Sequence, residues 1–593
     1  MRDLTTTFSN EGLLPRVPLP TLDDSCSLLL EWCAPLLTAD ELATTEAAVA
    51  AFLAPDSPAH VLHADLERYN DSPGVLSWLD DFWRTRYLGR RDRIALNANF
   101  FFLFQDARGA DQVDRATGLI ASSLAYKALV DAEQLPPVVL RGQAQSMLQH
   151  KYLFSATRIP GADQDTVRAP YGDEWPGPSP ARHIVVFHRG RMFRMDVLDE
   201  QGKPYATSEL ADGLRSVLAG EEAHYSPVGH LTTKARAAWA ASREALIAED
   251  PANAEALDVV ETALFCVSLE SDAPADKLAA CDALLHGDSA NRWFDKAVTF
   301  VVFADGQAGI NVEHCLLDGT TILAFVDKVV GTPVDPGTPG SGIPKVEPIR
   351  FVLGDALRVD VEAAGQAFAN YAAATATTEL SFADIGTDRI KQLGMSPDAF
   401  VQAAYQLAHY RAKGLTGATY ESIATRQFQN GRTEAMRVVT PEMVRFVQAM
   451  QDPDADAATR RAALAEAGAK HVARAKQCQA GQAPEQHLWE LQMIQRRRGA
   501  ELGATEPLAL YESPGWQIMR DDYLSTSSAP SHNIQYFGFG STSSRCIGVA
   551  YVLLPGRLNV YLSTPQPVAE QMHAFADALR DSLSELIDLL AGA

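Results

Sequence analysis

Short apolar runs alternate with longer stretches of helical apolar spacing along the chain. Runs rich in β-branched and aromatic residues predict strands, and apolar residues three or four positions apart predict helices. Strands and helices mixed in a non-repeating order favour an α/β fold with mixed sheets. The predicted strands are His183–Phe187, Ala297–Phe303, Gly548–Leu553 and Leu558–Ser563. The predicted helices are Ser25–Leu37, Thr38–Leu53, Arg115–Asp131, Glu209–Ala219, Thr233–Ala248, Ala356–Ala374, Pro397–Lys413 and Val568–Leu590.

The polar residues between these elements mark helix starts and one long loop. Asp24 or Ser25 is the expected N-cap of the first helix, and Thr38 that of the second, because these side chains accept hydrogen bonds from backbone N–H groups. Closely spaced Pro and Gly residues predict a loop over Gly331–Pro348. We place a domain boundary in this loop, since 593 residues are too many for one hydrophobic core.

Composition excludes several classes of function. The formal charge of −24 would repel a nucleic-acid backbone, so we expect no nucleic-acid partner. No apolar run is long enough to span a membrane, and the first residues lack the pattern of an export signal. The seven scattered cysteines contain no CxxC pair, so we expect neither a disulfide framework nor a metal site. We expect a cytoplasmic monomer with no bound cofactor.

The segment Gly309–Gly319 carries the sharpest chemical signal. His314 follows an apolar strand, Asp318 comes four residues later, and Gly319 lets the chain turn. A neutral imidazole fixed near a carboxylate suits a general base, although such a pair is also common as a purely structural contact. The pattern His-x-x-x-Asp-Gly recurs across CoA-dependent acyltransferases, including chloramphenicol acetyltransferase and the condensation domains of peptide synthetases.

Two polar segments are candidates for the rest of a site. Hydroxyls in Leu524–Pro530 suit hydrogen-bond donation to an oxyanion, although a Ser/Thr-rich turn such as Ser541–Ser544 is the plainer interpretation. Gly417–Glu434 holds more polar side chains than packing requires. We expect this second segment to line a polar pocket.

Taken in order along the chain, these motifs resemble the carnitine/choline O-acyltransferase family. The resemblance extends to Leu14–Pro20, Ser77–Trp83, Asn97–Phe101 and Ser396–Arg411, so it covers nearly the whole chain. It implies a two-domain, chloramphenicol-acetyltransferase-like α/β fold. Each half would hold a mixed β-sheet flanked by helices, with an active-site tunnel between the halves.

The resemblance also implies the domain ranges. Residues 1–88 would pack with a C-terminal domain of residues 350–593, which carries the CoA and acceptor sites. Residues 89–349 would form the other domain and carry the catalytic histidine. The loop predicted from Pro and Gly residues agrees with this division.

The reaction implied by the resemblance is acyl transfer from acyl-CoA, the co-substrate, to the hydroxyl of a small-molecule alcohol. His314 is the implied base, and the Ser527 hydroxyl is the implied donor to the oxyanion. Asp318 would pair with Arg432 and so hold the histidine loop. No covalent acyl-enzyme is required, so we expect Cys315 to be a bystander.

The implied CoA site departs from the family pattern at one position. Members of the family carry basic residues ahead of a Ser-Pro-Asp element to bind the 3′-phosphate. Lys391 matches one of them, and Thr387 replaces the other. Two alternatives stay open for Arg389: it compensates, because a guanidinium binds phosphate well, or it points to solvent. The other implied CoA contacts are Asp398, Ser422 and Ser528.

The implied acceptor site also departs from the family pattern. Tyr420 and Thr433 match residues that bind the carboxylate of carnitine, but Gln486 stands where the family usually has arginine. A neutral amide gives up charge-assisted pairing with a carboxylate. The acceptor stays open between carnitine or a carnitine-like alcohol and choline or another alcohol without a carboxylate. The remaining implied contacts are Ser525, Thr526 and Phe539.

The length of the acyl group is indicated by Phe537. The family's acetyl-preferring member has a bulky residue at the matching position, whereas long-chain members have glycine there. A phenylalanine ring would fill the groove that a long chain needs, whereas a shift of one residue in the match would place Gly538 there instead. We therefore expect short acyl groups.

Two other classes of protein compete with this interpretation. A condensation-type domain shares the His-x-x-x-Asp-Gly pattern and takes its acyl group from a carrier protein, but it lacks the Tyr420, Thr433 and Ser-Thr-Ser elements. A catalytically inactive scaffold would be expected to have lost His314 or Ser527, and the chain retains both.

Overall fold

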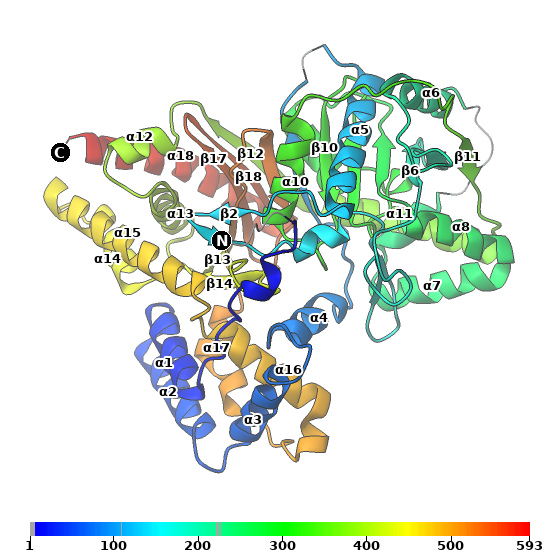
Figure 1. The fold of residues 1–593 in the computed structure, drawn as a ribbon. Coiled ribbons are helices and arrows are strands. Elements are labelled where there is room, and N and C mark those ends of the chain that lie inside the picture. Colours follow the sequence, from blue (N-terminus) through cyan, green and yellow to red (C-terminus); the bar gives the residue numbers. More distant parts are fainter. Residues whose placement is uncertain (1–5, 108, 221–224, 226, 593) are drawn as a thin grey trace. The chain divides into compact units, whose positions relative to one another are not determined.

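The computed structural model describes residues 6–107, 109–220, 225 and 227–592 of the chain (Figure 1). Two compact units are distinguished by their internal packing. The first comprises Met1–Glu11, Arg84–Glu379 and Ala529–Gly540, and the second comprises Gly12–Trp83, Leu380–Ser528 and Ser541–Ala593. Compared with the predicted domain ranges, the first unit also takes in residues 1–11, 84–88, 350–379 and 529–540.

An eight-stranded sheet forms the core of the first unit. Its strands lie in the order β11 (Val346–Ile349), β7 (Arg191–Asp196), β6 (His183–His188), β8 (Cys266–Leu269), β9 (Val298–Val302), β10 (Ala308–Val312), β1 (Phe100–Phe104) and β16 (Ile534–Phe539). Strands β6, β8 and β9 pair in parallel, and the other neighbours are antiparallel. Every residue of β1, β8, β9 and β10 is buried, as expected for strands covered on both faces.

Helices flank this sheet. Helix α9 (Lys277–Leu285) packs against β1, β10 and β16, whereas α5 (Gln112–Asp131) packs against β9 and against α10 (Gly319–Gly331). The other helices are α6 (Thr207–Leu218), α7 (Arg236–Glu249), α8 (Pro251–Thr262) and α11 (Asp355–Ala373). Short elements are β2 (Val139–Leu140), β3 (Gln143–Ala144), β4 (Thr157–Ile159), β5 (Thr166–Arg168) and the 3₁₀ helices η1 (Glu11–Leu13), η3 (Leu148–Tyr152), η4 (Val228–Thr233) and η5 (Ser289–Asn291).

A six-stranded mixed sheet forms the core of the second unit. Its order is β12 (Thr375–Phe382), β18 (Arg557–Pro565), β17 (Ile547–Leu554), β15 (Leu524–Ser528), β13 (Thr419–Ala424) and β14 (Thr433–Arg437). Strands β13, β15 and β17 pair in parallel, whereas β14 and β18 are antiparallel to their neighbours β13 and β17. Two mixed sheets flanked by helices confirm the predicted fold class.

Helix α13 (Pro397–Lys413) of the second unit packs against α18 (Ala569–Ala591) and α15 (Ala457–Gln479). Helix α15 also contacts β13 and β14. The other helices are α1 (Leu22–Cys33), α2 (Ala39–Phe52), α3 (Pro58–Asn70), α12 (Thr387–Gln392), α14 (Pro441–Gln451), α16 (Glu485–Leu502) and α17 (Pro514–Met519), with the 3₁₀ helices η2 (Ala34–Leu36), η6 (Ala509–Glu512) and η7 (Gln566–Val568). Helix α4 (Asp80–Leu88) begins in the second unit and ends in the first, which starts at Arg84.

The four predicted strands are confirmed as β6, β9, β17 and β18, and all of the predicted helices are present. Thr38 is the N-cap of α2, and its backbone N–H donates to Glu41 Oε2 at 2.8 Å. The predicted N-cap of α1 is wrong. Thr21 caps that helix by accepting from Asp24 N at 3.1 Å, so Asp24 and Ser25 lie inside the helix. The predicted loop ends where β11 begins, at Val346.

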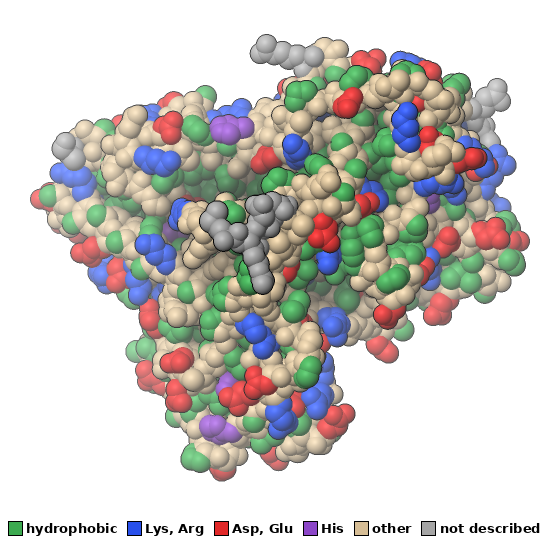
Figure 2. Space-filling model, viewed as in Figure 1, with side chains coloured by type: hydrophobic (Ala, Val, Ile, Leu, Met, Phe, Trp, Pro, Cys, Tyr) green, Lys and Arg blue, Asp and Glu red, His purple; other side chains and the backbone are tan. Residues whose placement is uncertain are grey.

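The surface carries charges of both signs, and the cysteines lie in the interior. On the face shown in Figure 2, Lys and Arg side chains are interspersed with Asp and Glu rather than gathered into one patch. No helix in the described ranges combines the length and the apolar character that a membrane span requires. All seven cysteines are buried free thiols.

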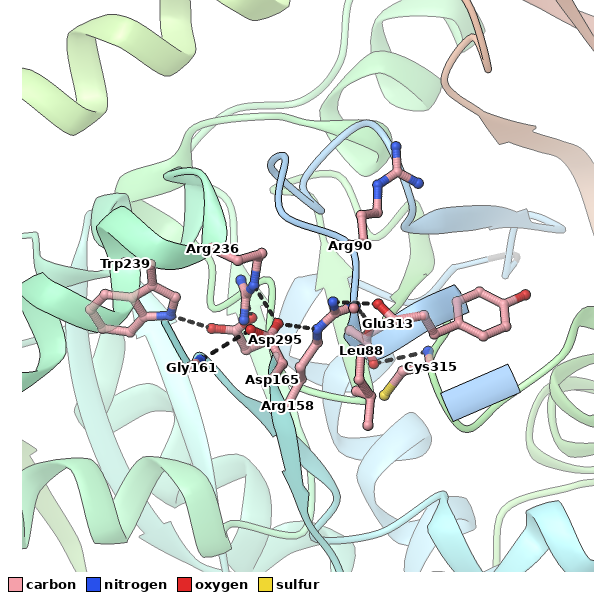
Figure 3. A network of polar contacts seen from close by, with 12 residues as sticks. Leu88, Arg90, Arg158, Gly161, Asp165, Arg236, Trp239, Asp295, Glu313 and Cys315 are labelled. Carbon is pink, nitrogen blue, oxygen red and sulfur yellow. Dashed lines mark hydrogen bonds and ion pairs between the residues drawn. The ribbon is translucent and has the colours of Figure 1, made fainter. Parts of the chain in front are cut away.

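A buried network of charges lies in the first unit (Figure 3). Arg158, on β4, donates from Nε to Asp165 Oδ2 at 2.6 Å and from Nη2 to the carbonyl oxygen of Tyr87 at 2.6 Å. Its Nη1 lies 3.3 Å from Glu313 Oε1. The side chains of Arg158 and Asp165 are 0% exposed, so these charges depend on one another rather than on water.

Arg236 extends this network to Asp295. Its Nε donates to Asp165 Oδ2 at 2.6 Å, and its Nη1 lies 2.8 Å from Asp295 Oδ1. Trp239 Nε1 donates to Asp295 Oδ2 at 2.6 Å. Burial raises the pKa of Asp295 to about 6, against the opposing effect of Arg236. Burial also raises the pKa of Asp165, but Arg236 and Arg158 outweigh it and lower that pKa overall.

We expect Arg158→Met to lower the free energy of unfolding by about 3–5 kcal/mol, because Asp165 and Glu313 would lose a buried partner. Urea denaturation followed by tryptophan fluorescence measures this loss. Arg90→Met is the matched control, since Arg90 pairs with Asp92 at an exposed position. Exposed pairs contribute about 1 kcal/mol or less. Equal losses in the two variants would contradict the role given to Arg158.

Candidate active site

His314 lies in the loop that joins β10 to α10. Strands β9 and β10 form an antiparallel hairpin in which Val298 faces Val312, and the chain leaves the sheet directly after Val312. The loop ends at Gly319, the first residue of α10. The histidine follows a strand, but this strand is β10 and not the predicted Ala297–Phe303, which is β9. The sequence pattern did not identify β10 as a strand.

The hydrogen bonds of His314 fix its tautomer. Its Nδ1 lies 2.7 Å from the carbonyl oxygen of Leu317. A carbonyl oxygen only accepts, so Nδ1 carries the proton and Nε2 carries the lone pair in the neutral ring. Asp318 Oδ1 lies 3.5 Å from Nδ1, where its charge would stabilise an imidazolium. The side chain of His314 is 28% exposed, and that of Asp318 is 3% exposed.

Aromatic rings surround the imidazole in the first unit. The rings of Tyr87 and Phe100 each have their centroids 5.1 Å from that of His314. Phe537 joins this group, with its ring centroid 6.3 Å from Phe100 and 5.5 Å from Phe539. Phe537 and Phe539, both on β16, therefore belong to an aromatic cluster with Tyr87, Phe100 and Phe102. This cluster contacts the imidazole through Tyr87 and Phe100.

Buried side chains hold the histidine loop at both ends. Glu313 Oε2 accepts from the backbone N–H of Cys315 at 3.1 Å, while Glu313 Oε1 lies against Arg158 of the charged network (Figure 3). Asp318 Oδ2 accepts from Gln149 Nε2 at 2.6 Å. The sequence did not point to Arg158, Glu313 or Gln149 as residues of the site. Arg432 lies in the second unit, and its pairing with Asp318 stays a prediction.

The strand register of the second unit gathers several predicted residues on one face of its sheet. Tyr420 of β13 pairs with Ser525 of β15, and Ala424 of β13 pairs with Thr433 of β14. Paired residues share a face, and alternate residues along a strand point to the same face. Tyr420, Thr433, Ser525 and Ser527 therefore share one face. Ser422, predicted as a CoA contact, lies on this face as well.

Thr526 lies on the opposite face. Its hydroxyl donates to the carbonyl oxygen of Tyr420 at 2.9 Å and accepts from Gln402 Nε2 at 3.0 Å. The side chain is fully buried. The structure thus separates Thr526 from Ser525 and Ser527 and gives it a strand-joining role. Ser528 is exposed at the end of the same strand.

The predicted CoA contacts Lys391 and Arg389 lie on α12, and Asp398 lies in the first turn of α13. Arg389 Nη1 is 3.2 Å from Asp384 Oδ2 in a largely exposed pair. Asp398 Oδ1 accepts from the hydroxyl of Tyr551 at 2.7 Å. The helices α12 and α13 contact each other, so these residues belong to one region of the second unit.

In the part of the chain that the structure describes, Asp398, Glu421 and His471 form one group of side chains of the kind that bind metals. His471 Nε2 lies 3.1 Å from Asp398 Oδ2 and 3.5 Å from Glu421 Oε2. Burial and the neighbouring Asp398 raise the pKa of Glu421. A raised pKa favours the protonated form of the Glu421 carboxyl, and metal ligands must be deprotonated.

Gln486 is the second residue of α16 and is 2% exposed. Its Nε2 donates to the carbonyl oxygen of Thr433 at 2.8 Å. This bond fixes the orientation of the amide, and its oxygen has no hydrogen-bond partner among the described residues. The guanidinium of Arg432 lies 5.3 Å from the ring of Trp83.

Comparison with solved structures finds likenesses of low similarity. The first condensation domain of the CDA synthetase matches with a TM-score of 0.39 and 10% identity, over 86% of this chain and 94% of that chain. The epimerization domain from the third module of tyrocidine synthetase B matches with a TM-score of 0.36 and 9% identity, over 88% of this chain and 98% of that chain.

Comparison of sequences finds relatives along nearly the whole chain. Carnitine O-acetyltransferase of Rattus norvegicus is 30% identical over 98% of this chain and 94% of its own length. Carnitine O-palmitoyltransferase 2, mitochondrial, of Rattus norvegicus is 29% identical over 99% and 94%. Peroxisomal carnitine O-octanoyltransferase of Mus musculus is 33% identical over 83% of each chain.

The sequence model described as Choline/Carnitine o-acyltransferase matches residues 17–581. This match includes the histidine loop, both sheets and every residue predicted for the site. The predicted resemblance is confirmed, and the chain is an acyltransferase that belongs to the choline/carnitine O-acyltransferase family.

Proposed function

We propose that this acyltransferase moves a short acyl group from CoA to the hydroxyl of carnitine or a carnitine-like alcohol, with His314 as general base. The hydrogen bond between His314 Nδ1 and the Leu317 carbonyl oxygen carries this proposal, because it leaves the lone pair on Nε2. The names of the relatives support carnitine and acyl groups of several lengths.

The reaction proceeds in two steps. His314 Nε2 takes the proton of the alcohol hydroxyl while the alcohol oxygen bonds to the thioester carbonyl carbon, which becomes tetrahedral. The Ser527 hydroxyl donates a hydrogen bond to the resulting oxyanion. The carbon–sulfur bond then breaks, the ester forms, and the imidazolium returns its proton to the CoA thiolate. Asp318 stabilises the imidazolium in between.

CoA is proposed to bind through the second unit. Lys391 and Arg389 bind its 3′-phosphate, and Asp398, Ser422 and Ser528 contact the rest of the CoA molecule. The placement of Lys391, Arg389 and Asp398 on the adjoining helices α12 and α13 supports this assignment. A cytoplasmic location stays a prediction, since two of the relatives are named as mitochondrial and peroxisomal. The monomeric state stays a prediction as well.

We expect His314→Ala to lower kcat about a thousandfold, because the alcohol would lose its base. Thiol release from acetyl-CoA, in the presence of carnitine, choline or a panel of amino alcohols, measures this rate. His573→Ala is the control, since His573 is exposed on α18. A native rate in the His314 variant would contradict the assignment. Failure of every alcohol to stimulate release would overturn the proposed acceptor class.

Choline or another alcohol without a carboxylate is the second candidate acceptor, and the Gln486 amide favours it. The orientation fixed by Thr433 leaves an oxygen, which accepts hydrogen bonds and attracts no carboxylate. The retained Tyr420 and Thr433 favour carnitine instead. Activity with the two alcohols decides between them.

We expect Gln486→Arg to lower the KM for carnitine about tenfold and to raise the KM for choline, because a guanidinium pairs with a carboxylate and repels a cation. Initial rates with each alcohol at saturating acetyl-CoA measure both values. Gln492→Arg, on the same helix, controls for the added charge. An unchanged ratio of the two KM values would contradict the placement of Gln486 in the acceptor site.

We expect Phe537→Ala to raise activity with octanoyl-CoA, relative to acetyl-CoA, about tenfold or more, because the aromatic cluster beside His314 would lose a ring. Rates with a series of acyl-CoA chain lengths measure this ratio. Phe104→Ala is the control, since Phe104 is equally buried and its ring contacts Phe300, outside the cluster. An increase in both variants would contradict an acyl pocket at Phe537.

A further inference from the structure

Asp318 occupies an N-cap position without using its carboxylate to cap the helix. It precedes α10 with extended backbone angles, yet its side chain accepts no hydrogen bond from the first turn of that helix. An N-cap aspartate ordinarily gains stability by accepting from these N–H groups. Here the carboxylate is turned toward His314 Nδ1 instead, at 3.5 Å. A group on another element binds the carboxylate in this orientation.

Gln149, on η3, supplies that group. Its Nε2 donates to Asp318 Oδ2 at 2.6 Å, and its Oε1 accepts from the backbone N–H of Asp318 at 2.8 Å. The same Oε1 accepts from Thr321 Oγ1 at 2.7 Å. Both ends of one amide thus bind the start of α10, and all three side chains are buried.

We infer that Gln149 is a positioning residue for His314, acting through Asp318. This inference rests on the proposed function, in which the imidazole is the base. The amide donates to one carboxylate oxygen and leaves the other facing the histidine. The two bonds to Gln149 Oε1 fix the backbone and the helix start from which that carboxylate projects. Loss of the amide would release Asp318 to cap α10.

In the part of the chain that the structure describes, the titratable groups near Gln149 lie on the histidine loop, on η3 itself (His150 and Lys151) and on η1. Asp318 and His314 belong to the loop, and His150 lies beside Gln149 with its Nδ1 2.9 Å from the hydroxyl of Tyr126 on α5. Glu11 Oε2 accepts from Ser146 Oγ at 2.9 Å. The carboxylate of Asp318 is the one that Gln149 contacts directly.

The substitution Gln149→Glu provides a test, because the side chain of glutamate has the shape of that of glutamine. Ionised, it accepts the bonds to Asp318 N and Thr321 but repels the Asp318 carboxylate. Protonated, it donates to Asp318 Oδ2 as the amide does. Two carboxylates at this distance share a proton with a raised pKa. We expect kcat of Gln149→Glu, divided by native kcat at the same pH, to rise about tenfold or more as pH falls from 9 to 6.

The other variants keep this test decisive. Gln149→Met has no charge and makes none of the three bonds, so its kcat should fall about tenfold or more at every pH while both KM values stay native. Gln145→Glu is the matched control. Gln145 is equally buried, and its Nε2 donates to the carbonyl oxygens of Gln143 and Ala144, away from the loop. Its kcat ratio should not change with pH.

Three results would overturn the inference while His314→Ala still abolishes activity: native kcat in both Gln149 variants, changes confined to KM, or the same pH-dependent ratio in Gln145→Glu. If the native protein released no thiol with any alcohol, the proposed function would fail. The pKa of His314 would then test the inference. It is measured by NMR of protein labelled at histidine, and the signal that is missing in His314→Gln is assigned to His314. Gln149→Met should lower that pKa, because the Asp318 carboxylate would move away, and an unchanged pKa would overturn the inference.

Discussion

The hydrogen bond between His314 Nδ1 and the Leu317 carbonyl oxygen fixes the tautomer of the imidazole on which the proposed chemistry depends. An imidazole presents a lone pair at only one nitrogen when neutral, and the carbonyl requires the proton to be on the other. The bond spans three residues of one loop, so it exists only while that loop keeps its shape. The buried groups at either end of the loop follow from this requirement.

Burying charge to hold a loop is costly unless each charge finds a partner. Arg158, Asp165, Arg236 and Asp295 form ion pairs with one another in the first unit, and Glu313 connects them to the histidine loop. A comparable amount of apolar packing would stabilise the fold equally well. The contacts of the network are directional, whereas apolar packing is not, since each guanidinium holds its partners at defined angles. That property suits a loop whose backbone carbonyl must meet a ring nitrogen.

Sequence patterns predicted only some of the uniformly buried strands, since β1, β8 and β10 were not predicted, and they missed the strands that carry polar residues. β6, β9, β17 and β18 are almost wholly buried and appear as apolar runs. β13 and β15 bear hydroxyls and a carboxyl on their faces, so their polar residues resembled a loop and a turn. Motifs located His314 and Asp318 because both lie in one short segment. Gln149 and Arg158 are distant in sequence from that loop, and only tertiary packing brings them to it. The orientation of Thr526 was likewise not predictable from its place between Ser525 and Ser527. Only the strand conformation of β15 turns its side chain to the opposite face of the sheet.

The central claim is that His314 acts as a base on the alcohol and never carries the acyl group itself. Intact-protein mass spectrometry after rapid mixing with acetyl-CoA, without any alcohol, tests this claim most directly. A base mechanism predicts an unchanged protein mass, together with initial-rate lines for the two substrates that intersect. An added acetyl group that forms and is discharged at the rate of turnover, with parallel initial-rate lines, would contradict it.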